Sequence, residues 1–117
     1  MYTYYIYILT NKKKGILYSG FTNNIIRTVY EHRSGLLKGY TKKHSIKKLV
    51  YMEKFKDIEQ AINWNDYIKE MGKEDKFSLI EQDNPEWRDF YYDLGGDDKY
   101  EFYDELIIKH RKGYAYQ

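Results

Sequence analysis

The fold is most clearly encoded in residues 6–20, which read IYILTNKKKGILYSG. Residues 2–9, which contain the first part of this stretch, have the alternating side-chain pattern of a β-strand and are rich in aromatic and β-branched residues. Residues 16–21 have the same character. The lysine-rich residues 11–15 end on a glycine and predict the hairpin turn between the two strands. Tyr7 and Tyr18 would then lie on neighbouring antiparallel strands, where their phenol groups can point at one place.

The remaining chain predicts helices and one further strand. In chain order the pattern predicts a helix from N-cap residues 22–24 to Arg33, a basic loop over 36–46, a strand over 48–55, helices over 57–71 and 74–82, a helix starting at Asn84-Pro85, and a last helix over 98–111. This order predicts an α+β domain over residues 1–94, with a small three-stranded antiparallel sheet flanked by helices. A helical C-terminal extension is expected over residues 95–117.

Composition narrows the class of protein. A chain of 117 residues is typical of one compact domain with a modest core. The absence of cysteine excludes disulfides and thiolate metal sites. There is no apolar run long enough to cross a membrane, and the N-terminus lacks the apolar region of a signal peptide. The sequence therefore predicts a soluble, intracellular protein with no membrane association.

Charge is divided unevenly between the two halves of the chain. Residues 1–50 carry ten Lys and Arg side chains and a single acid, Glu31, whereas residues 51–117 carry ten bases and seventeen acids. A basic half of this kind favours phosphate contact by one face of the molecule, although a solvated lysine surface is the simpler alternative. The side chains expected to contact phosphate are Lys12, Lys13, Lys14, Arg27, Lys42, Lys43 and Lys47.

Helical geometry sorts the side chains of the first helix. Its apolar positions, residues 25, 26, 29 and 30, share one face that is expected to pack on the sheet. Thr28 and His32 are four residues apart and lie together at one edge of that face. Arg27 is about 100° away from Thr28 around the helix axis.

The helix over 57–71 has a polar residue inside its apolar stripe. Residues 58, 61, 62 and 68 form the expected stripe, and Asn65 lies within it. A buried amide needs a hydrogen-bond partner, and Tyr7 or Tyr18 is the expected one. Asp66 is about 100° off this face.

The motifs together resemble the GIY-YIG nuclease superfamily in its small stand-alone form. Ile6-Tyr7 stands where the family has its first motif, and Leu17-Tyr18-Ser19-Gly20 where it has Tyr-Ile-Gly. Three later stretches are also similar to the family, namely Tyr30-Glu31-His32-Arg33-Ser34-Gly35, then Gly39-Tyr40-Thr41-Lys42-Lys43 with Leu49-Val50-Tyr51, and finally Asn84-Pro85-Glu86-Trp87-Arg88-Asp89. The resemblance covers roughly residues 2–94.

The resemblance implies hydrolysis of phosphodiesters with one divalent metal ion, usually Mg²⁺. In such an enzyme a glutamate on the later helix holds the metal, and the two tyrosines position or deprotonate the attacking water. An arginine on the first helix, four residues before its histidine, stabilises the charge that develops on the phosphate. The family site then falls on Tyr7, Tyr18, Thr28, His32, Asn65 and Asn84 of this chain.

Two of these positions depart from the family pattern. Counting back from His32 places Thr28 at the arginine position, and the pattern from Ala61 to Lys69 places Asn65 at the glutamate position. A neutral amide binds Mg²⁺ poorly compared with a carboxylate, so no cofactor is expected unless activity is retained through Asp66 and Mg²⁺. Arg27 and Asp66 point to other sides of their helices, and each could replace the missing group only if a bulge or π-turn shifted its helix by one residue.

Three functions remain open at this point. The first is a nuclease-fold protein that contacts nucleic acid, DNA more than RNA, with cleavage impaired or lost. The second is a structural or partner-binding subunit derived from an inactive nuclease, in which residues 95–117 bind a partner protein or a second copy. The third is an active Mg²⁺-dependent endonuclease with migrated ligands. The site residues also have structural alternatives, namely cross-strand packing for the tyrosines, an exposed helix position for His32 and a helix N-cap for Asn84.

Overall fold

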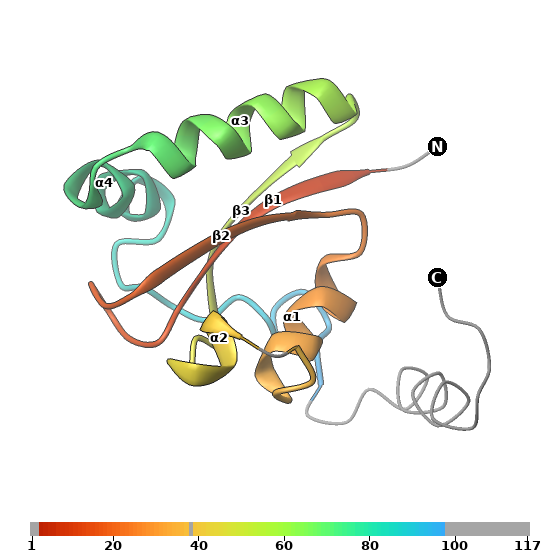
Figure 1. The fold of residues 1–117 in the computed structure, drawn as a ribbon, viewed down its shortest axis with the longest axis vertical. Coiled ribbons are helices and arrows are strands. Elements are labelled where there is room, and N and C mark those ends of the chain that lie inside the picture. The colour runs from red at the N-terminus through yellow and green to blue at the C-terminus, as the bar shows by residue number, and fades with distance from the viewer. Residues whose placement is uncertain (1–2, 38, 98–117) are drawn as a thin grey trace.

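A computed structural model describes residues 3–37 and 39–97 of the chain (Figure 1). Its elements, in chain order, are β1 (Tyr4–Thr10), β2 (Leu17–Thr22), α1 (Ile25–Arg33), α2 (Tyr40–Lys43), β3 (Lys48–Phe55), α3 (Ile58–Glu70) and α4 (Lys73–Asp83). The three strands form one antiparallel sheet in the order β2-β1-β3. The predicted α+β class and the three-stranded antiparallel sheet are therefore confirmed, and the helix expected over 98–111 lies outside the described residues.

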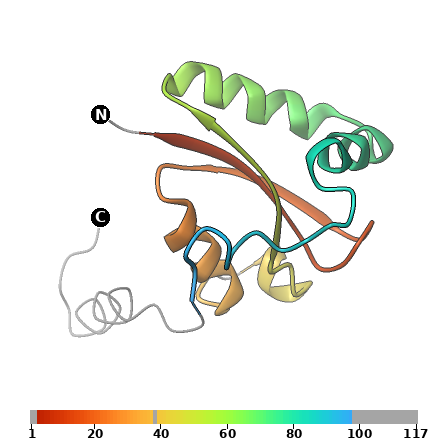
Figure 2. The same ribbon diagram turned by 180° about the vertical axis from the view of Figure 1, so that it is seen from behind.

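The sheet separates two layers of helices. Figures 1 and 2 show α3 and α4 on one side of the sheet and α1 and α2 on the other. Successive side chains of β1 point to opposite faces, so Ile6 and Ile8 pack with α3 and α4, whereas Tyr7 and Leu9 pack with α1. None of the helices in the described part of the chain is long and apolar enough to cross a bilayer.

Strand pairing places two loops at one end of the sheet. In β1, Tyr7 lies opposite Gly20, and Leu9 lies opposite Tyr18. The last residue of β1, Thr10, pairs with Lys48 of β3, and its carbonyl accepts a hydrogen bond of 3.2 Å from the backbone N–H of Lys47. The hairpin turn after β1 and the segment between α2 and β3 therefore lie at the same end of the sheet.

Helix boundaries follow the predicted capping residues. The Asn24 side chain accepts a hydrogen bond from the Arg27 backbone N–H at the start of α1, and the Asp57 side chain accepts one from the Glu59 N–H at the start of α3. The expected end of the first helix at Arg33 is also confirmed. The segment expected as a loop over 36–46 contains one helical turn, α2.

The helix predicted to begin at Asn84-Pro85 is wrong, because Asn84 ends α4 instead. Its side chain accepts a hydrogen bond from the Arg88 N–H and donates to the carbonyls of Val50 and Arg88. The chain then runs beside β3, where the Phe90 N–H donates to the Leu49 carbonyl and the Leu49 N–H donates to Asp89. These hydrogen bonds along β3 satisfy the backbone that a helix would otherwise have satisfied.

The apolar stripe predicted for α3 is partly wrong. Ile58 and Ile62 are 43% and 42% exposed, whereas Ala61, Asn65 and Ile68 are buried. The buried positions are spaced i, i+4 and i+7, which is one face of a helix. Ile62 lies about 100° from Ala61 around the axis, and Ile58 is at the first turn, so neither side chain is covered by the sheet.

Candidate functional site

Three aromatic rings meet between the sheet and α1. The ring centres of Tyr18 and His32 are 5.4 Å apart, those of Tyr7 and His32 are 6.1 Å apart, and those of the two tyrosines are 6.4 Å apart. The Tyr7 hydroxyl is within 3.3 Å of His32 Nε2. The convergence of Tyr7 and Tyr18 that the sequence predicts is therefore observed, and His32 joins them from α1. We call these three side chains the ring centre.

Gly20 gives Tyr7 the room to reach this position. A Cβ atom added at Gly20 would lie 2.4 Å from the Tyr7 hydroxyl and 2.5 Å from Cζ of the same ring. Tyr7 lies directly opposite Gly20 in the sheet, so the ring crosses the neighbouring strand where that strand has no side chain. This contact is a physical reason for a glycine two residues after Tyr18.

His32 is held through both of its ring nitrogens. Nε2 faces the Tyr7 hydroxyl, and Nδ1 is 2.8 Å from the Thr41 hydroxyl, which comes from α2. Burial of the imidazole lowers the pKa of His32 to about 4, so the ring is neutral near pH 7. Thr41 was not predicted as a partner of His32. The stretch Gly39-Tyr40-Thr41 predicts only part of a basic loop, and the contact depends on how α2 packs against α1.

The Tyr7 phenol is also neutral. Its burial, and secondarily the nearby Tyr18 and Glu31, raise the pKa of Tyr7 well above its usual value. A phenol with a raised pKa keeps its proton at neutral pH, so Tyr7 can form hydrogen bonds in the ring centre but is not ready to act as a base. Glu31, which the sequence analysis did not single out, is close enough to contribute to this shift.

The register of α1 is as predicted. The Thr28 hydroxyl lies on the same helix edge as His32 and is 2.7 Å from the hydroxyl of Thr22, at the end of β2. Arg27 points to another side, where its Nε is 3.8 Å from a carboxylate oxygen of Glu31. The side chain at the predicted arginine position is thus a small hydroxyl that bonds to the end of β2.

Asn65 and Asp66 also follow the predicted register, but Asn65 lacks the predicted partner. Asn65 is 8% exposed, and its Oδ1 accepts no hydrogen bond from the described residues, while Asp66 is exposed. The expected hydrogen bond to Tyr7 or Tyr18 is wrong, because both tyrosines point to the α1 face of the sheet and α3 packs on the other face. Among the hydrogen bonds of the described chain, the Asn84 side chain likewise bonds only to the turn that it stabilises and to β3.

Six of the predicted lysines lie together at one end of the sheet. Lys12, Lys13 and Lys14 form the hairpin turn after β1, and Lys42, Lys43 and Lys47 belong to α2 and the segment before β3. All six are exposed, and the two segments meet through the Lys47–Thr10 hydrogen bond. Tyr18 pairs with Leu9, next to Thr10, so the ring centre lies close to this basic end. Arg27 lies in the first turn of α1 and is not part of this basic end.

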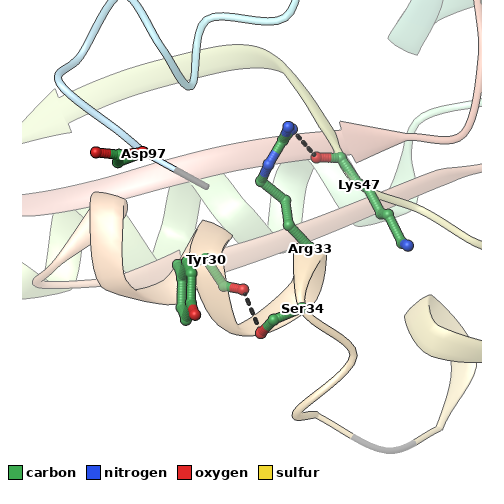
Figure 3. Close-up of a pocket in the computed structure, with 5 residues that line it drawn as sticks. All are labelled: Tyr30, Arg33, Ser34, Lys47 and Asp97. Atoms are coloured by element: carbon green, nitrogen blue, oxygen red, sulfur yellow. Dashed lines mark hydrogen bonds between the residues drawn. The ribbon is translucent and has the colours of Figure 1, made fainter. Parts of the chain in front are cut away.

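A separate hollow of about 250 Å³ lies on the opposite side of α1 from Thr28. Figure 3 shows its lining, with the Arg33 guanidinium bonded to the Lys47 carbonyl and the Ser34 hydroxyl bonded to the Tyr30 carbonyl. Arg33 also bonds to Asp89 at 2.6 Å and to the Tyr92 hydroxyl at 2.7 Å. Its charge is therefore engaged in holding residues 89–92 against α1, and the hollow is not part of the ring centre.

Comparison with known proteins assigns the chain to a family. A sequence model of the GIY-YIG catalytic domain matches residues 3–78. The chain is 37% identical over 76 residues to the UPF0213 protein CPE1444 of Clostridium perfringens, a match that covers 65% of this chain and 81% of that protein. It is 39% identical over 83 residues to a UPF0213 protein of Syntrophus aciditrophicus, covering 70% and 93% of the two chains.

A solved structure is also similar to this chain. The solution NMR structure of the UPF0213 protein BH0048 from Bacillus halodurans aligns with a TM-score of 0.49 and 28% identity, over 74% of this chain and 92% of that one. The matched residues 3–78 include the strands that carry Tyr7 and Tyr18 and the helix that carries His32. The chain belongs to the GIY-YIG catalytic domain family and is related to its UPF0213 members.

Proposed function

We propose that this protein binds nucleic acid through the basic end of its sheet and that its ability to cleave phosphodiesters is weakened or lost. The observation that carries the proposal is a ring centre beside an exposed lysine cluster, with Thr28 and Asn65 at the positions where the family has arginine and glutamate. The scaffold that would orient a phosphate is present, and the two groups that would carry charge in the reaction are replaced by neutral ones.

The lysine cluster supports phosphate contact. The six exposed lysines come from two segments that meet at the end of β1, so their charges add on one surface. Their flexible ammonium groups suit contacts with the phosphate backbone, which position a nucleic acid without reading its sequence. Acidic residues are concentrated in the second half of the chain, and residues 1–50 contain only one, Glu31.

The donor atoms near the ring centre support impaired chemistry. Tyr7 and His32 are both neutral, His32 uses both ring nitrogens, and the Thr28 hydroxyl is bonded to Thr22. Asn65 lies on the other face of the sheet, and its amide oxygen is a poor replacement for the carboxylate that Mg²⁺ prefers, so the residues at the family positions do not fit the metal of the family. Losing one group that stabilises charge in a transition state commonly costs about 10²–10³ in rate. Without the guanidinium and the carboxylate, we expect cleavage to be slower by at least this factor.

The salt dependence of binding tests the lysine cluster. We expect Lys42→Ala with Lys43→Ala to lower the slope of log K against log salt by up to about 2, because each lost phosphate contact removes roughly one released counterion. The matched control is Lys54→Ala with Lys69→Ala, which removes the same charge from exposed positions on β3 and α3. Fluorescence anisotropy with a labelled DNA, measured over a series of salt concentrations, gives both slopes. Equal slopes for the two double variants would remove α2 from the interface.

A second candidate function is favoured by the outer face of α3. Ile58 and Ile62, one helical turn apart, are exposed there, whereas Trp64 and Tyr67, whose rings stack with centres 5.4 Å apart, lie on another side of the helix. Exposed apolar groups on one helix face are typical of contact with another protein. This alternative, a partner-binding subunit, predicts no affinity for nucleic acid at moderate salt and a stable protein complex lost in Ile62→Lys. Measurable nucleic-acid affinity of the isolated protein would argue against it.

A further inference from the structure

The exposed ring of Tyr40 lies in the most basic part of the surface. Tyr40 is 53% exposed, and its ring centre is 4.5 Å from that of His44, one helical turn later. The two rings therefore form a small aromatic surface on α2, which we call the Tyr40–His44 pair. A half-exposed aromatic ring has a free face on which a ligand can stack.

The charge around this pair suits a phosphate-bearing ligand. Lys42 and Lys43 are exposed in the same helical turn, and Lys47 follows before β3. Residues 32–52 contain six Lys and Arg side chains and no Asp or Glu. A ligand lying on the Tyr40–His44 pair would meet the exposed ammonium groups that follow it in the chain, those of Lys42, Lys43 and Lys47.

The pair is also fixed relative to the ring centre. Thr41, the residue after Tyr40, is buried and bonds to His32 through its hydroxyl at 2.8 Å. The α2 turn is closed by backbone hydrogen bonds from Lys43 to the Gly39 carbonyl and from His44 to the Tyr40 carbonyl. The Tyr40 ring is therefore held next to the site that the proposed function assigns to the phosphate backbone.

A second exposed aromatic pair serves as a contrast. Trp64 and Tyr67 stack on α3, but Asp66 and Glu70 are exposed on the same helix. Their carboxylates would repel a phosphate backbone. Aromatic rings combined with lysines are what proteins use to hold unpaired nucleotides, because every base has a face that can stack and the phosphates follow the positive charge. In the described structure this combination occurs on α2 and not on α3.

We propose that the Tyr40–His44 pair stacks an unpaired base, so that this protein selects single-stranded nucleic acid, or a junction with unpaired nucleotides, over continuous duplex. The bases of a duplex are already stacked on one another and present no free face to Tyr40. The inference rests on the proposed function and adds the class of nucleic acid that the basic end binds.

The experiment compares three labelled DNAs of equal length, about 20 nucleotides, by fluorescence anisotropy at one moderate salt concentration. They are a single strand, the same sequence as a blunt duplex, and a single strand with abasic sites in its central positions, which keeps every phosphate and removes the stacking bases. We expect the single strand to bind more tightly than the other two. Tyr40→Ala should weaken single-strand binding by about 5- to 100-fold, because one stacked base typically contributes that much, and should leave the abasic strand unchanged.

Two variants separate stacking from other effects. Tyr40→Phe keeps the ring and should bind the single strand as the parent protein does. Tyr67→Ala removes an exposed ring of α3 and should change nothing. Circular dichroism and thermal unfolding check that Tyr40→Ala is folded, which its half-exposed position predicts.

The outcomes distinguish the inference from the proposed function. Binding that is equal for all three DNAs, or that Tyr40→Ala weakens equally for all three, overturns the stacking role and leaves the lysine cluster intact. No binding of any DNA at low salt overturns the proposed function, and the stacking role falls with it. Weakening by both Tyr40→Ala and Tyr40→Phe would assign the effect to the hydroxyl and contradict stacking.

Discussion

At the scale of single residues, the ring centre is a chain of neutral groups rather than a set of charged catalysts. The Tyr7 hydroxyl, the His32 ring and the Thr41 hydroxyl follow one another at 3.3 Å and 2.8 Å. Because burial lowers the pKa of His32 and raises that of Tyr7, both groups stay uncharged near pH 7. These three hydrogen-bonded side chains connect β1, α1 and α2, so they have a structural role whether or not cleavage survives.

The buried imidazole predicts that stability depends on pH. The folded-state pKa of His32 is about 4, below the usual value of about 6.5, so the unfolded chain takes up this proton first as pH falls. The stability that the buried neutral His32 contributes is fully present above about pH 6.5 and is lost as the pH falls toward 4. We expect the free energy of unfolding to fall by on the order of 2 kcal/mol from this group.

Urea unfolding at a series of pH values between about 7 and 4 measures this loss. Carboxylates also titrate in the lower part of the range, so the parent protein is compared with His32→Gln, which cannot take up the proton. The difference between the two pH profiles should shrink as pH falls. Parallel profiles for the two proteins would mean that His32 takes up its proton at the same pH in the folded and unfolded states.

A second prediction at this scale concerns the glycine beneath Tyr7. Gly20→Ala places a methyl group 2.4 Å from the Tyr7 hydroxyl, so the ring has to move, and we expect a loss of about 1–3 kcal/mol in unfolding free energy. The control is Gly72→Ala, at a site with no atom within 4 Å of the added Cβ and with negative φ. Thermal unfolding compares the two variants. Equal stability of both would show that Tyr7 is not packed against this backbone.

At the scale of elements, α3 combines a buried amide without a partner for its oxygen and an exposed apolar edge. The Asn65 Oδ1 atom is buried on the side of the sheet that α3 covers, and it accepts no hydrogen bond from the described residues. Leaving a polar atom buried and unpaired typically costs about 1–3 kcal/mol. This helix therefore keeps a residue that stability alone does not favour.

We therefore expect Asn65→Leu to raise the unfolding free energy by about 1–2 kcal/mol, because a side chain of similar shape replaces the unpaired amide. The matched control is Asn63→Leu, an exposed position on the same helix, where the change should stay within about 0.5 kcal/mol. Chemical denaturation of both variants gives the comparison. A destabilised Asn65→Leu would indicate that the amide has a partner, such as a buried water, that offsets its burial.

Sequence patterns predicted most elements and missed those that depend on distant contacts. The hairpin, α1 with its Asn24 cap, and the third strand follow from local composition and capping, and the register that buries Asn65 but not Asp66 follows from helical spacing. The helix expected at Asn84-Pro85 failed because hydrogen bonds to β3, which is far away in sequence, hold that segment beside the strand. Asn65 was assigned the wrong partner because helical periodicity does not state on which face of the sheet the helix packs.

The candidate site was predicted to a similar extent. Tyr7 and Tyr18 could be placed together because strand alternation and a short hairpin fix their relative positions. The roles of Thr41 and Glu31 could not be predicted, since the first depends on how α2 packs against α1 and the second on the distance between a helix side chain and a strand. Neither arrangement leaves a local sequence signal.

At the scale of the whole molecule, charge and chemistry are arranged at one end of the sheet. The hairpin turn and α2 bring six lysines together next to the ring centre, whereas most acids lie in the second half of the chain, which includes α3 and α4. This division favours one orientation of a polyanion relative to Tyr7, Tyr18 and His32. Under the proposed function, this GIY-YIG domain would place nucleic acid against its ring centre and cleave it poorly.

The most direct test is to incubate the protein with a labelled DNA that it binds, in the presence of Mg²⁺, and to measure bound and cleaved DNA in the same samples. The account predicts a stable complex whose DNA stays intact, with the same complex formed by Tyr7→Phe. Mg²⁺-dependent strand cleavage that disappears in Tyr7→Phe would contradict it, because the ring centre would then be the working site of a nuclease despite Thr28 and Asn65.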